Sequence, residues 1–223
     1  MRRNRMNIAI DGPAGAGKST IAKLVAKELG NIYVDTGAMY RAMALYMIKN
    51  GISPDDVASI EEACEHADIS IAYQDGAQHV MLNGEDVTGE LRTEAVGNMA
   101  SSTSVNARVR TKLVSLQQKL AERTGVVMDG RDIGTVVLPN AEVKVYLTAS
   151  VETRAKRRYK ELIEKGLTAD FDAIAADIRD RDYRDMNRKN SPLRQADDAV
   201  LVDSSDMTID EVVSAILDLT KKA

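Results

Sequence analysis

The 223-residue sequence contains no tryptophan, one phenylalanine, one cysteine, two histidines and four prolines. A single cysteine, Cys64, cannot form a disulfide within the chain, so we expect a reducing compartment and interpret Cys64 as a small buried hydrophobic residue. Two histidines and one cysteine are too few for the usual zinc site. No apolar stretch approaches the roughly 18 residues that a transmembrane helix requires. These absences favour a cytoplasmic protein that does not span a membrane.

The N-terminal residues 1–5 include three arginines, as the start of a signal peptide would. The apolar run that follows is only about five residues long and ends at Asp11, which is too short for the core of a signal peptide. The sequence leaves open whether translation starts at Met1 or at Met6.

The net charge of −4 argues against a nucleic acid or a membrane surface as the partner. Any basic site must therefore be a local cluster of arginines. A chain that is 44% hydrophobic and 29% charged suits one soluble α/β domain with room for an insertion. At this length it can bury roughly 70% of its unfolded surface without disulfides or metals.

Short apolar runs alternate with segments of helical periodicity, which is typical of a parallel α/β sheet. The expected strands are 7–11, 32–35, 126–129, 143–149 and 199–203. The expected helices are 18–29, 38–49, 108–123, 151–165, 171–189 and a last one that opens with a capping box at 208–211. Methionines at positions 39, 43 and 47 lie at helical spacing, and we expect them in the core.

The rhythm changes after residue 54, where a short helical stretch comes first. Residues 69–73 and 79–82 alternate apolar and polar side chains around Asp75-Gly76, which predicts a β-hairpin, and Asn83-Gly84 predicts another turn. Antiparallel strands do not belong inside a parallel core. We therefore interpret residues 60–104, approximately, as an inserted subdomain.

Residues 12–19 read Gly-Pro-Ala-Gly-Ala-Gly-Lys-Ser and fit the phosphate-loop spacing G-x-x-x-x-G-K-[ST]. Glycines let consecutive backbone N–H groups turn toward an anion, and the following helix directs its positive end at the same anion. Lys18 would place a charge near the β- and γ-phosphates, and the Ser19 hydroxyl could reach Mg²⁺. A strand before the motif and a helix after it favour a nucleoside triphosphate site over a chance glycine-rich turn.

Other classes of protein also use this loop. A guanine-nucleotide switch would usually carry N-K-x-D at a later strand end, and the sequence has no such motif. A mechanical ATPase usually needs a longer chain or partner surfaces. A compact core with one insertion and clustered arginines favours an enzyme that encloses two small anionic substrates.

Four segments together resemble the bacterial cytidylate kinases in order and spacing. They are 12–20, 35–41 (Asp-Thr-Gly-Ala-Met-Tyr-Arg), 129–134 (Asp-Gly-Arg-Asp-Ile-Gly) and 181–188 (Arg-Asp-Tyr-Arg-Asp-Met-Asn-Arg). The resemblance extends from about Met6 to the end of the chain and leaves only residues 1–5 outside. It implies a single domain over 1–223 with a three-layer P-loop α/β core, a parallel sheet, an inserted subdomain that binds the nucleoside monophosphate, and a short lid at about 151–169.

The resemblance also implies the donor site. The residues expected to bind ATP are Gly12, Pro13, Ala14, Gly15, Ala16, Gly17, Lys18, Ser19, Thr20, Arg154 and Arg157. Mg²⁺ would be held by Ser19 and Asp129, directly or through water. The residues expected to act in catalysis are Lys18, Arg41, Arg131 and Arg158. For the arginines that open helix 151–165, a solvated charged face is the alternative interpretation.

For the acceptor, the resemblance implies a CMP site. Its expected members are Thr36, Arg41, Ser101, Arg110, Arg131, Asp132, Arg181, Asp185 and Arg188. Cytosine presents an amino donor at N4 and acceptors at N3 and O2, so Asp132 would accept from N4 while Arg110 and Ser101 donate to the ring. A shift of one residue within 101–104 stays open, because three serines and a threonine stand there together.

Arg181, Asp185 and Arg188 share one helical face. Periodicity alone favours a ladder of exposed ion pairs for them, each worth about 0.2–0.5 kcal/mol. The resemblance instead assigns Asp185 to the ribose hydroxyls and the two arginines to phosphate and sugar.

The sequence thus predicts a monomeric kinase that transfers the γ-phosphoryl group of MgATP to CMP, and to dCMP, giving ADP and CDP or dCDP. Within kinases, UMP or another monophosphate is the alternative acceptor. From a different class, an ATP-dependent binding module without transfer activity is the alternative.

Overall fold

A computed structural model describes residues 6–74 and 76–222, so residues 1–5, where the start of translation is undecided, and Asp75 of the predicted hairpin turn lie outside the described residues. The chain divides into two compact units, Met1–Tyr33 with Thr124–Ala223, and Val34–Arg123. The second unit contains the range expected for the insertion. The assignment of one domain with an insertion at 60–104 and a lid at 151–169 stays a prediction.

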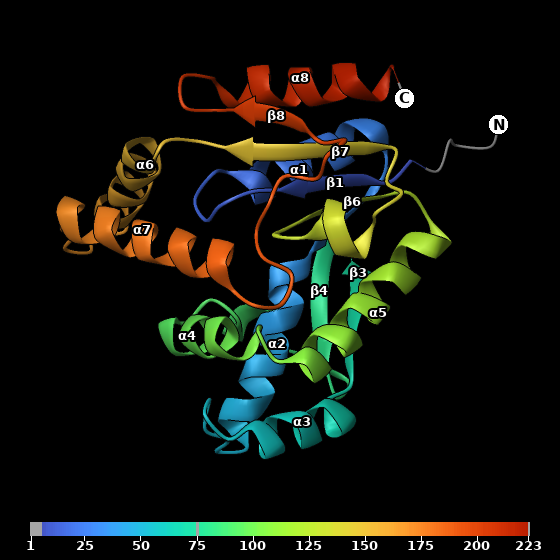
Figure 1. Ribbon diagram of the computed structural model, residues 1–223, viewed down its shortest axis with the longest axis vertical. Coiled ribbons are helices and arrows are strands. Elements are labelled where there is room, and N and C mark those ends of the chain that lie inside the picture. The colour runs from blue at the N-terminus through green and yellow to red at the C-terminus, as the bar shows by residue number, and fades with distance from the viewer. Residues whose placement is uncertain (1–5, 75, 223) are drawn as a thin grey trace. The chain divides into compact units, whose positions relative to one another are not determined.

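The first unit is built on a five-stranded sheet in the order β2-β6-β1-β7-β8 (Figure 1). The strands are β1 (Ile8–Asp11), β2 (Ile32–Asp35), β6 (Val126–Gly130), β7 (Val143–Thr148) and β8 (Val200–Asp203). The pairs β1–β6, β1–β7 and β7–β8 are parallel. β2 passes from the first unit into the second between Tyr33 and Val34. Every residue of β1 is buried, as expected for the central strand of a parallel sheet.

Four helices complete the first unit: α1 (Lys18–Leu29), α6 (Val151–Glu164), α7 (Phe171–Asn187) and α8 (Ile209–Thr220). α1 ends at Gly30, which adopts the left-handed conformation that favours glycine as a C-cap. α8 opens with the predicted capping box between Thr208 and Glu211. α6 follows the carboxyl end of β7 and packs on α7 through Ala155, Ala175 and Ile178 (Figure 1).

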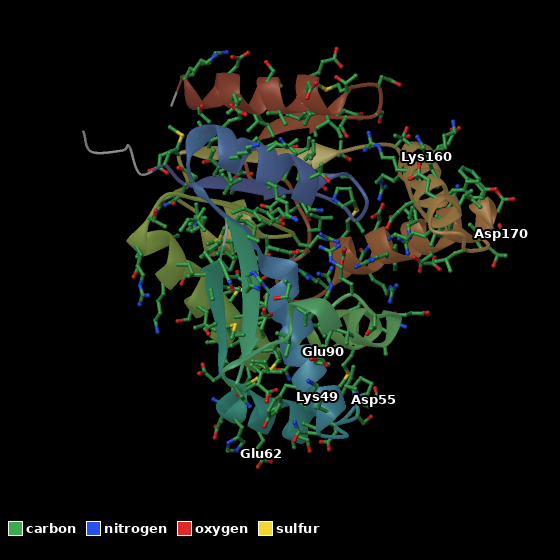
Figure 2. All side chains as sticks on the ribbon, turned by 180° about the vertical axis from the view of Figure 1, so that it is seen from behind. Lys49, Asp55, Glu62, Glu90, Lys160 and Asp170 are labelled. Atoms are coloured by element: carbon green, nitrogen blue, oxygen red, sulfur yellow. The ribbon has the colours of Figure 1, made fainter. Side chains whose placement is uncertain are left out.

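The second unit contains α2 (Thr36–Lys49), α3 (Val57–His66), α4 (Glu94–Thr103) and α5 (Ala107–Arg123). It also holds the three-stranded sheet β3 (Ile69–Gln74), β4 (Ala77–Leu82) and β5 (Glu85–Asp86), and a short 3₁₀ turn, η1 (Thr88–Glu90). Met39, Met43, Met47 and Cys64 are buried in its core, which confirms the sequence-based interpretation of these side chains. Figure 2 labels Lys49 and Glu90, which form an ion pair at 3.0 Å between the end of α2 and η1.

The described strands and helices confirm the predicted elements to within a few residues. The elements that were not predicted are α4, the short β5 and η1, and a π-helical turn, η2 (Ile133–Val137), directly after Asp132. Among the described residues, no helix is both long enough and apolar enough to cross a membrane.

Candidate active site

The phosphate loop joins the end of β1 to the start of α1, as the motif predicts. Gly12, Gly15 and Gly17 all have positive φ angles, of 150°, 76° and 89°. A Cβ at Gly12 would lie 1.9 Å from the carbonyl oxygen of Leu147 in β7, so only glycine fits where the loop leaves the sheet. Gly17 is the N-cap of α1 and makes no side-chain cap, which leaves the first N–H groups of the helix available to an anion.

Three carbonyl groups of this loop accept hydrogen bonds from cationic side chains. Lys18 Nζ donates to the oxygen of Pro13 at 2.7 Å. Arg154 Nη1 donates to the oxygen of Ala14 at 3.0 Å, and Arg157 Nη1 to the oxygen of Ala16 at 3.5 Å. The backbone of the loop is therefore fixed by charges from α1 and α6.

Lys18 is almost fully buried, with 6% of its surface exposed. Burial, reinforced by the positive charge of Arg131, lowers the pKa of Lys18 to about 7, against the opposing influence of Asp129 and Asp11. Negative charge placed beside this ammonium would oppose the effect of burial and favour its charged form. The polyphosphate of a nucleotide would supply that negative charge.

The side chain of Ser19, at the start of α1, meets that of Asp129, near the carboxyl end of β6. Ser19 Oγ donates to Asp129 Oδ2 at 2.9 Å, while the hydroxyl of Tyr33 donates to Asp129 Oδ1 at 2.8 Å. A hydroxyl and a carboxylate are the hard oxygen ligands that Mg²⁺ prefers, and Tyr33 would orient the carboxylate from behind. Within the described ranges no group of three or more His, Cys, Asp or Glu side chains could hold a metal by itself, so a magnesium ion here would also need phosphate or water ligands.

Asp11, the last residue of β1, fixes the turn that carries Arg131 and Asp132. Its two carboxylate oxygens accept from the backbone N–H groups of Ile133 and Gly134, each at 2.7 Å. Burial raises the pKa of Asp11 to about 6, although these two hydrogen bonds oppose the shift. The strand that leads into the phosphate loop thus also positions the first turn of η2.

Arg131 and Asp132 both form ion pairs with the C-terminal end of α7. Arg131 Nε donates to Asp185 Oδ2 at 2.8 Å, with both side chains about one-fifth exposed. Arg188 Nη2 lies 3.7 Å from Asp132 Oδ1, and both of these side chains are 8% exposed. The first unit therefore brings four of the predicted acceptor-site residues together, including the carboxylate expected to read the cytosine amino group.

The three arginines of α6 have different environments. Arg154 is buried and forms a bidentate ion pair with Asp182 of α7, with N–O distances of 3.0 and 2.6 Å. Arg157 donates through Nη2 to the backbone oxygen of Ser204 at 2.7 Å. Arg158 is about half exposed and pairs with Glu161. Arg154 therefore does not belong to a solvated charged face, whereas Arg158 is accessible to solvent and its expected role in catalysis stays a prediction.

A cavity of about 410 Å³ lies beside the phosphate loop, between α6 and α7. Its wall includes Ala14 and Gly15 of the loop and the side chains of Arg158 and Arg181. Arg181 is exposed on its helix, as is Thr20 at the far end of the phosphate-loop motif. This space adjoins the loop and is large enough for part of a nucleotide.

The second unit holds the remaining predicted residues on three helices. Thr36 is buried at the start of α2, and the half-buried Arg41 lies one turn further along. Ser101 is on α4, and Arg110, buried on α5, places its guanidinium 5.9 Å from the ring centre of Tyr40. Because α2 contacts both α4 and α5, this unit gathers its own set of donors.

Sequence reasoning missed four residues that shape the site: Asp11, Tyr33, Asp182 and Ser204. Asp11 and Tyr33 both belong to the strand pattern. The position of Asp11 directly before the phosphate loop was an available signal. Tyr33 meets Asp129 only in the folded protein, so the sequence offered no signal for it. Asp182 was hidden in a helix rich in charges at ion-pair spacing. Ser204 follows the last strand, at the sheet edge where α/β proteins bind ligands, and that position was the available signal.

Comparison with known proteins agrees over nearly the whole chain. The sequence model of the family "Cytidylate kinase" matches residues 8–222. A cytidylate kinase from Caldicellulosiruptor bescii is 53% identical over 218 residues, covering 98% of this chain and 96% of that protein, and one from Ligilactobacillus salivarius is 50% identical over 98% and 97%. An uncharacterized protein from Eubacterium ventriosum of known structure matches with a TM-score of 0.53 and 12% identity over 99% of this chain and 100% of that one, which supports the fold alone. The P-loop α/β fold, the residues that the family model spans and the identity to its curated members agree: the chain belongs to the cytidylate kinase family.

Proposed function

We propose that the protein transfers the γ-phosphoryl group of ATP to CMP, giving ADP and CDP. The proposal is supported by one observation above all: the first unit assembles Lys18, Ser19 and Asp129 at a phosphate loop in a chain that belongs to the cytidylate kinase family. We extend the proposal to dCMP as an acceptor.

To catalyse this transfer, the protein must mainly position the two nucleotides and neutralise the charge of their phosphates. The attacking oxygen of a 5′-phosphate is already anionic, so no general base is needed, and we expect no covalent intermediate on the enzyme. The barrier comes from the approach of two polyanions. Lys18, Arg41, Arg131 and Arg158 would offset that charge, and arginines in such roles accelerate related reactions by roughly 10³- to 10⁵-fold.

Ser19 and Asp129 are the residues that would hold Mg²⁺, with Tyr33 orienting the carboxylate. When it is bound with ATP, Mg²⁺ supplies positive charge that bridges the phosphate oxygens. Lys18 would bind the β- and γ-phosphates, with Thr20 and the loop from Gly12 to Ser19 completing the donor site. Arg157 would contact the donor nucleotide from α6.

For CMP we propose two groups of ligands, one in each unit. In the first unit, Asp132 would accept from N4 of cytosine, Asp185 would bind the ribose, and Arg131, Arg181 and Arg188 would bind phosphate and sugar. In the second unit, the proposed ligands are Thr36, Arg41, Ser101 and Arg110. Uracil presents an acceptor where cytosine presents N4–H₂, so a carboxylate at Asp132 would disfavour UMP, by roughly 10⁴-fold if the site is fully desolvated.

The test is a coupled assay of ADP release with CMP, dCMP, UMP and AMP as acceptors in the presence of Mg²⁺. We expect the highest kcat/KM with CMP, and we expect the Lys18→Met variant to lose nearly all activity. Activity with UMP or AMP but not with CMP would contradict the assignment of CMP as the acceptor. Tight ATP binding with no CDP after prolonged incubation would instead support the alternative of a binding module. A monomeric state and a cytoplasmic location also stay predictions, the second one argued from the single cysteine.

A further inference from the structure

The guanidinium group of Arg154 joins three segments of the first unit. Its Nε donates to the backbone oxygen of Ala149 at the end of β7, at 2.9 Å. Its Nη1 reaches both Ala14 in the phosphate loop and Asp182 on α7, and Nη2 donates to the second oxygen of Asp182 at 2.6 Å. Arg154 has 4% of its surface exposed. Each of its three guanidinium nitrogens donates a hydrogen bond to a protein oxygen.

The contact with Ala14 controls the direction of an N–H group in the loop. In a planar trans peptide the C=O and N–H groups point in opposite directions. A carbonyl of Ala14 that is held toward Arg154 therefore turns the N–H of Gly15 away from α6. The stem of Arg154 also packs against Gly15, because a Cβ built there would lie 3.5 Å from Cβ of the arginine. Arg154 thus holds the loop on the side away from the N–H of Gly15.

Asp182 is the anchor of this arrangement. Its side chain is 13% exposed and accepts two nearly parallel hydrogen bonds, the geometry that orients a guanidinium most strictly. Asp185, three residues later on the same helix, holds Arg131. Two carboxylates on adjacent turns of α7 therefore fix one arginine against the phosphate loop and another in the group of acceptor-site residues.

We propose that Asp182 and Arg154 are positioning residues for ATP: Asp182 orients Arg154, and Arg154 holds the carbonyl of Ala14 so that the loop's amide groups are arranged for the phosphates. The proposal rests on the proposed function for its kinetic consequences. It differs from the sequence-based expectation, in which Arg154 itself contacts ATP.

The first experiment compares Asp182→Asn with Asp180→Asn, an exposed position on the same helix that undergoes the same change of charge. Equilibrium binding of ATP and the Michaelis constants for ATP and CMP are measured for both variants. We expect Asp182→Asn to raise the Kd and KM for ATP about tenfold or more, because small displacements of a binding loop are costly. We expect the KM for CMP to change less than about twofold, and Asp180→Asn to match the wild type. If Arg154 were instead a ligand of ATP, releasing it from Asp182 would leave ATP binding unchanged or tighter, which would overturn the proposal.

A second variant separates this role from a purely structural ion pair. Breaking a buried pair on one side can unfold a protein, whereas replacing both partners with apolar residues is often tolerated. The double variant Arg154→Met/Asp182→Leu should therefore keep a melting temperature near that of the wild type. It should still bind ATP about tenfold or more weakly, because no guanidinium holds Ala14. Wild-type affinity for ATP in this folded variant would contradict the proposal.

The binding measurement uses ATP alone, so it does not depend on the acceptor. A wild-type protein that binds ATP and leaves CMP unchanged would refute the proposed function while the comparison of Asp182→Asn with Asp180→Asn still tests the loop. Conversely, a wild type that phosphorylates CMP, together with an Asp182→Asn variant that binds ATP normally, would refute only the present inference.

Discussion

Arg131 offers the clearest prediction at the scale of single residues. Its guanidinium is about one-fifth exposed and is held by Asp185 in the first unit. If it stabilises charge that develops during transfer, Arg131→Ala should lower kcat by roughly 10³-fold while changing the KM for ATP far less. Steady-state kinetics would measure both constants, with Arg184→Ala on the exposed face of α7 as the control. An increase in the KM for ATP as large as the loss in kcat would show that Arg131 serves binding instead.

Asp132 tests the choice of base. An asparagine there could still accept from N4 of cytosine through its oxygen, yet its amide could also donate to O4 of uracil. We expect Asp132→Asn to reduce the preference for CMP over UMP, expressed as the ratio of kcat/KM values, by about 100-fold or more. Asp172→Asn, an exposed position at the start of α7, provides the matched control. An unchanged ratio in the Asp132 variant would show that this residue does not determine the preference for CMP over UMP.

At the scale of elements, the junction of β1 with the phosphate loop should be intolerant of any side chain. Gly12 has a φ of 150°, and the Cβ added in Gly12→Ala would enter the backbone of β7, whereas Gly166 has a φ of 72° and the Cβ added in Gly166→Ala would meet nothing within 4 Å. We expect the Gly166 variant to lose about 1–2 kcal/mol of stability from backbone strain alone. The Gly12 variant should lose more and bind ATP more weakly. Urea denaturation and ATP titration would measure the two effects, and equal losses in both variants would contradict the steric argument.

Local signals explain why most elements could be predicted from the sequence. α1 is bounded by two glycines with left-handed backbone, α8 by a capping box, and β1 by an abrupt change from apolar residues to a glycine turn. α4 was missed because its helical pattern lies within a run of serines, threonines and glycine that resembles a loop. The π-helical turn after Asp132 could not be predicted, because it depends on Asp11 accepting from two amides that are more than 120 residues away in the chain.

The residues of the candidate site likewise divide into those that a local sequence signal marks and those that depend on distant contacts. Lys18, Ser19 and Asp129 were found because a loop motif and the end of an apolar strand mark them. Asp182 was not, because its importance comes from one partner, Arg154, that is 28 residues away on another helix. Spacing along a single helix could indicate only that a charged residue stands there.

At the scale of the whole molecule, Asp11 should leave a signature in the dependence of stability on pH. The pKa of its carboxyl is raised from 3.8 to about 6 in the folded protein, so the native state binds more protons than the unfolded state between about pH 6 and pH 4. The contribution of Asp11 to stability therefore rises as the pH falls through this window. The free energy of unfolding of the wild type should gain about 2 kcal/mol relative to that of Asp11→Asn between pH 7 and pH 4.

Urea denaturation of both proteins across that range would measure this difference. The comparison of the two proteins cancels the titration of the carboxylates they share, and any constant loss from the altered hydrogen bonds leaves the trend unaffected. A difference that does not change with pH would mean that the pKa of Asp11 is not raised in the folded protein.

The burial of Cys64 also has a practical consequence. The only thiol in the chain is enclosed in the core, where burial raises its pKa and keeps it in the unreactive form. A maleimide dye should therefore not react with the native protein and should react only with a cysteine introduced at the surface. Suitable positions are Lys160 on α6 and Glu62 on α3, whose side chains are about three-quarters exposed (Figure 2). The natural sequence can thus be labelled at one chosen position, and the response of each unit to nucleotides followed in solution, without first removing a reactive background.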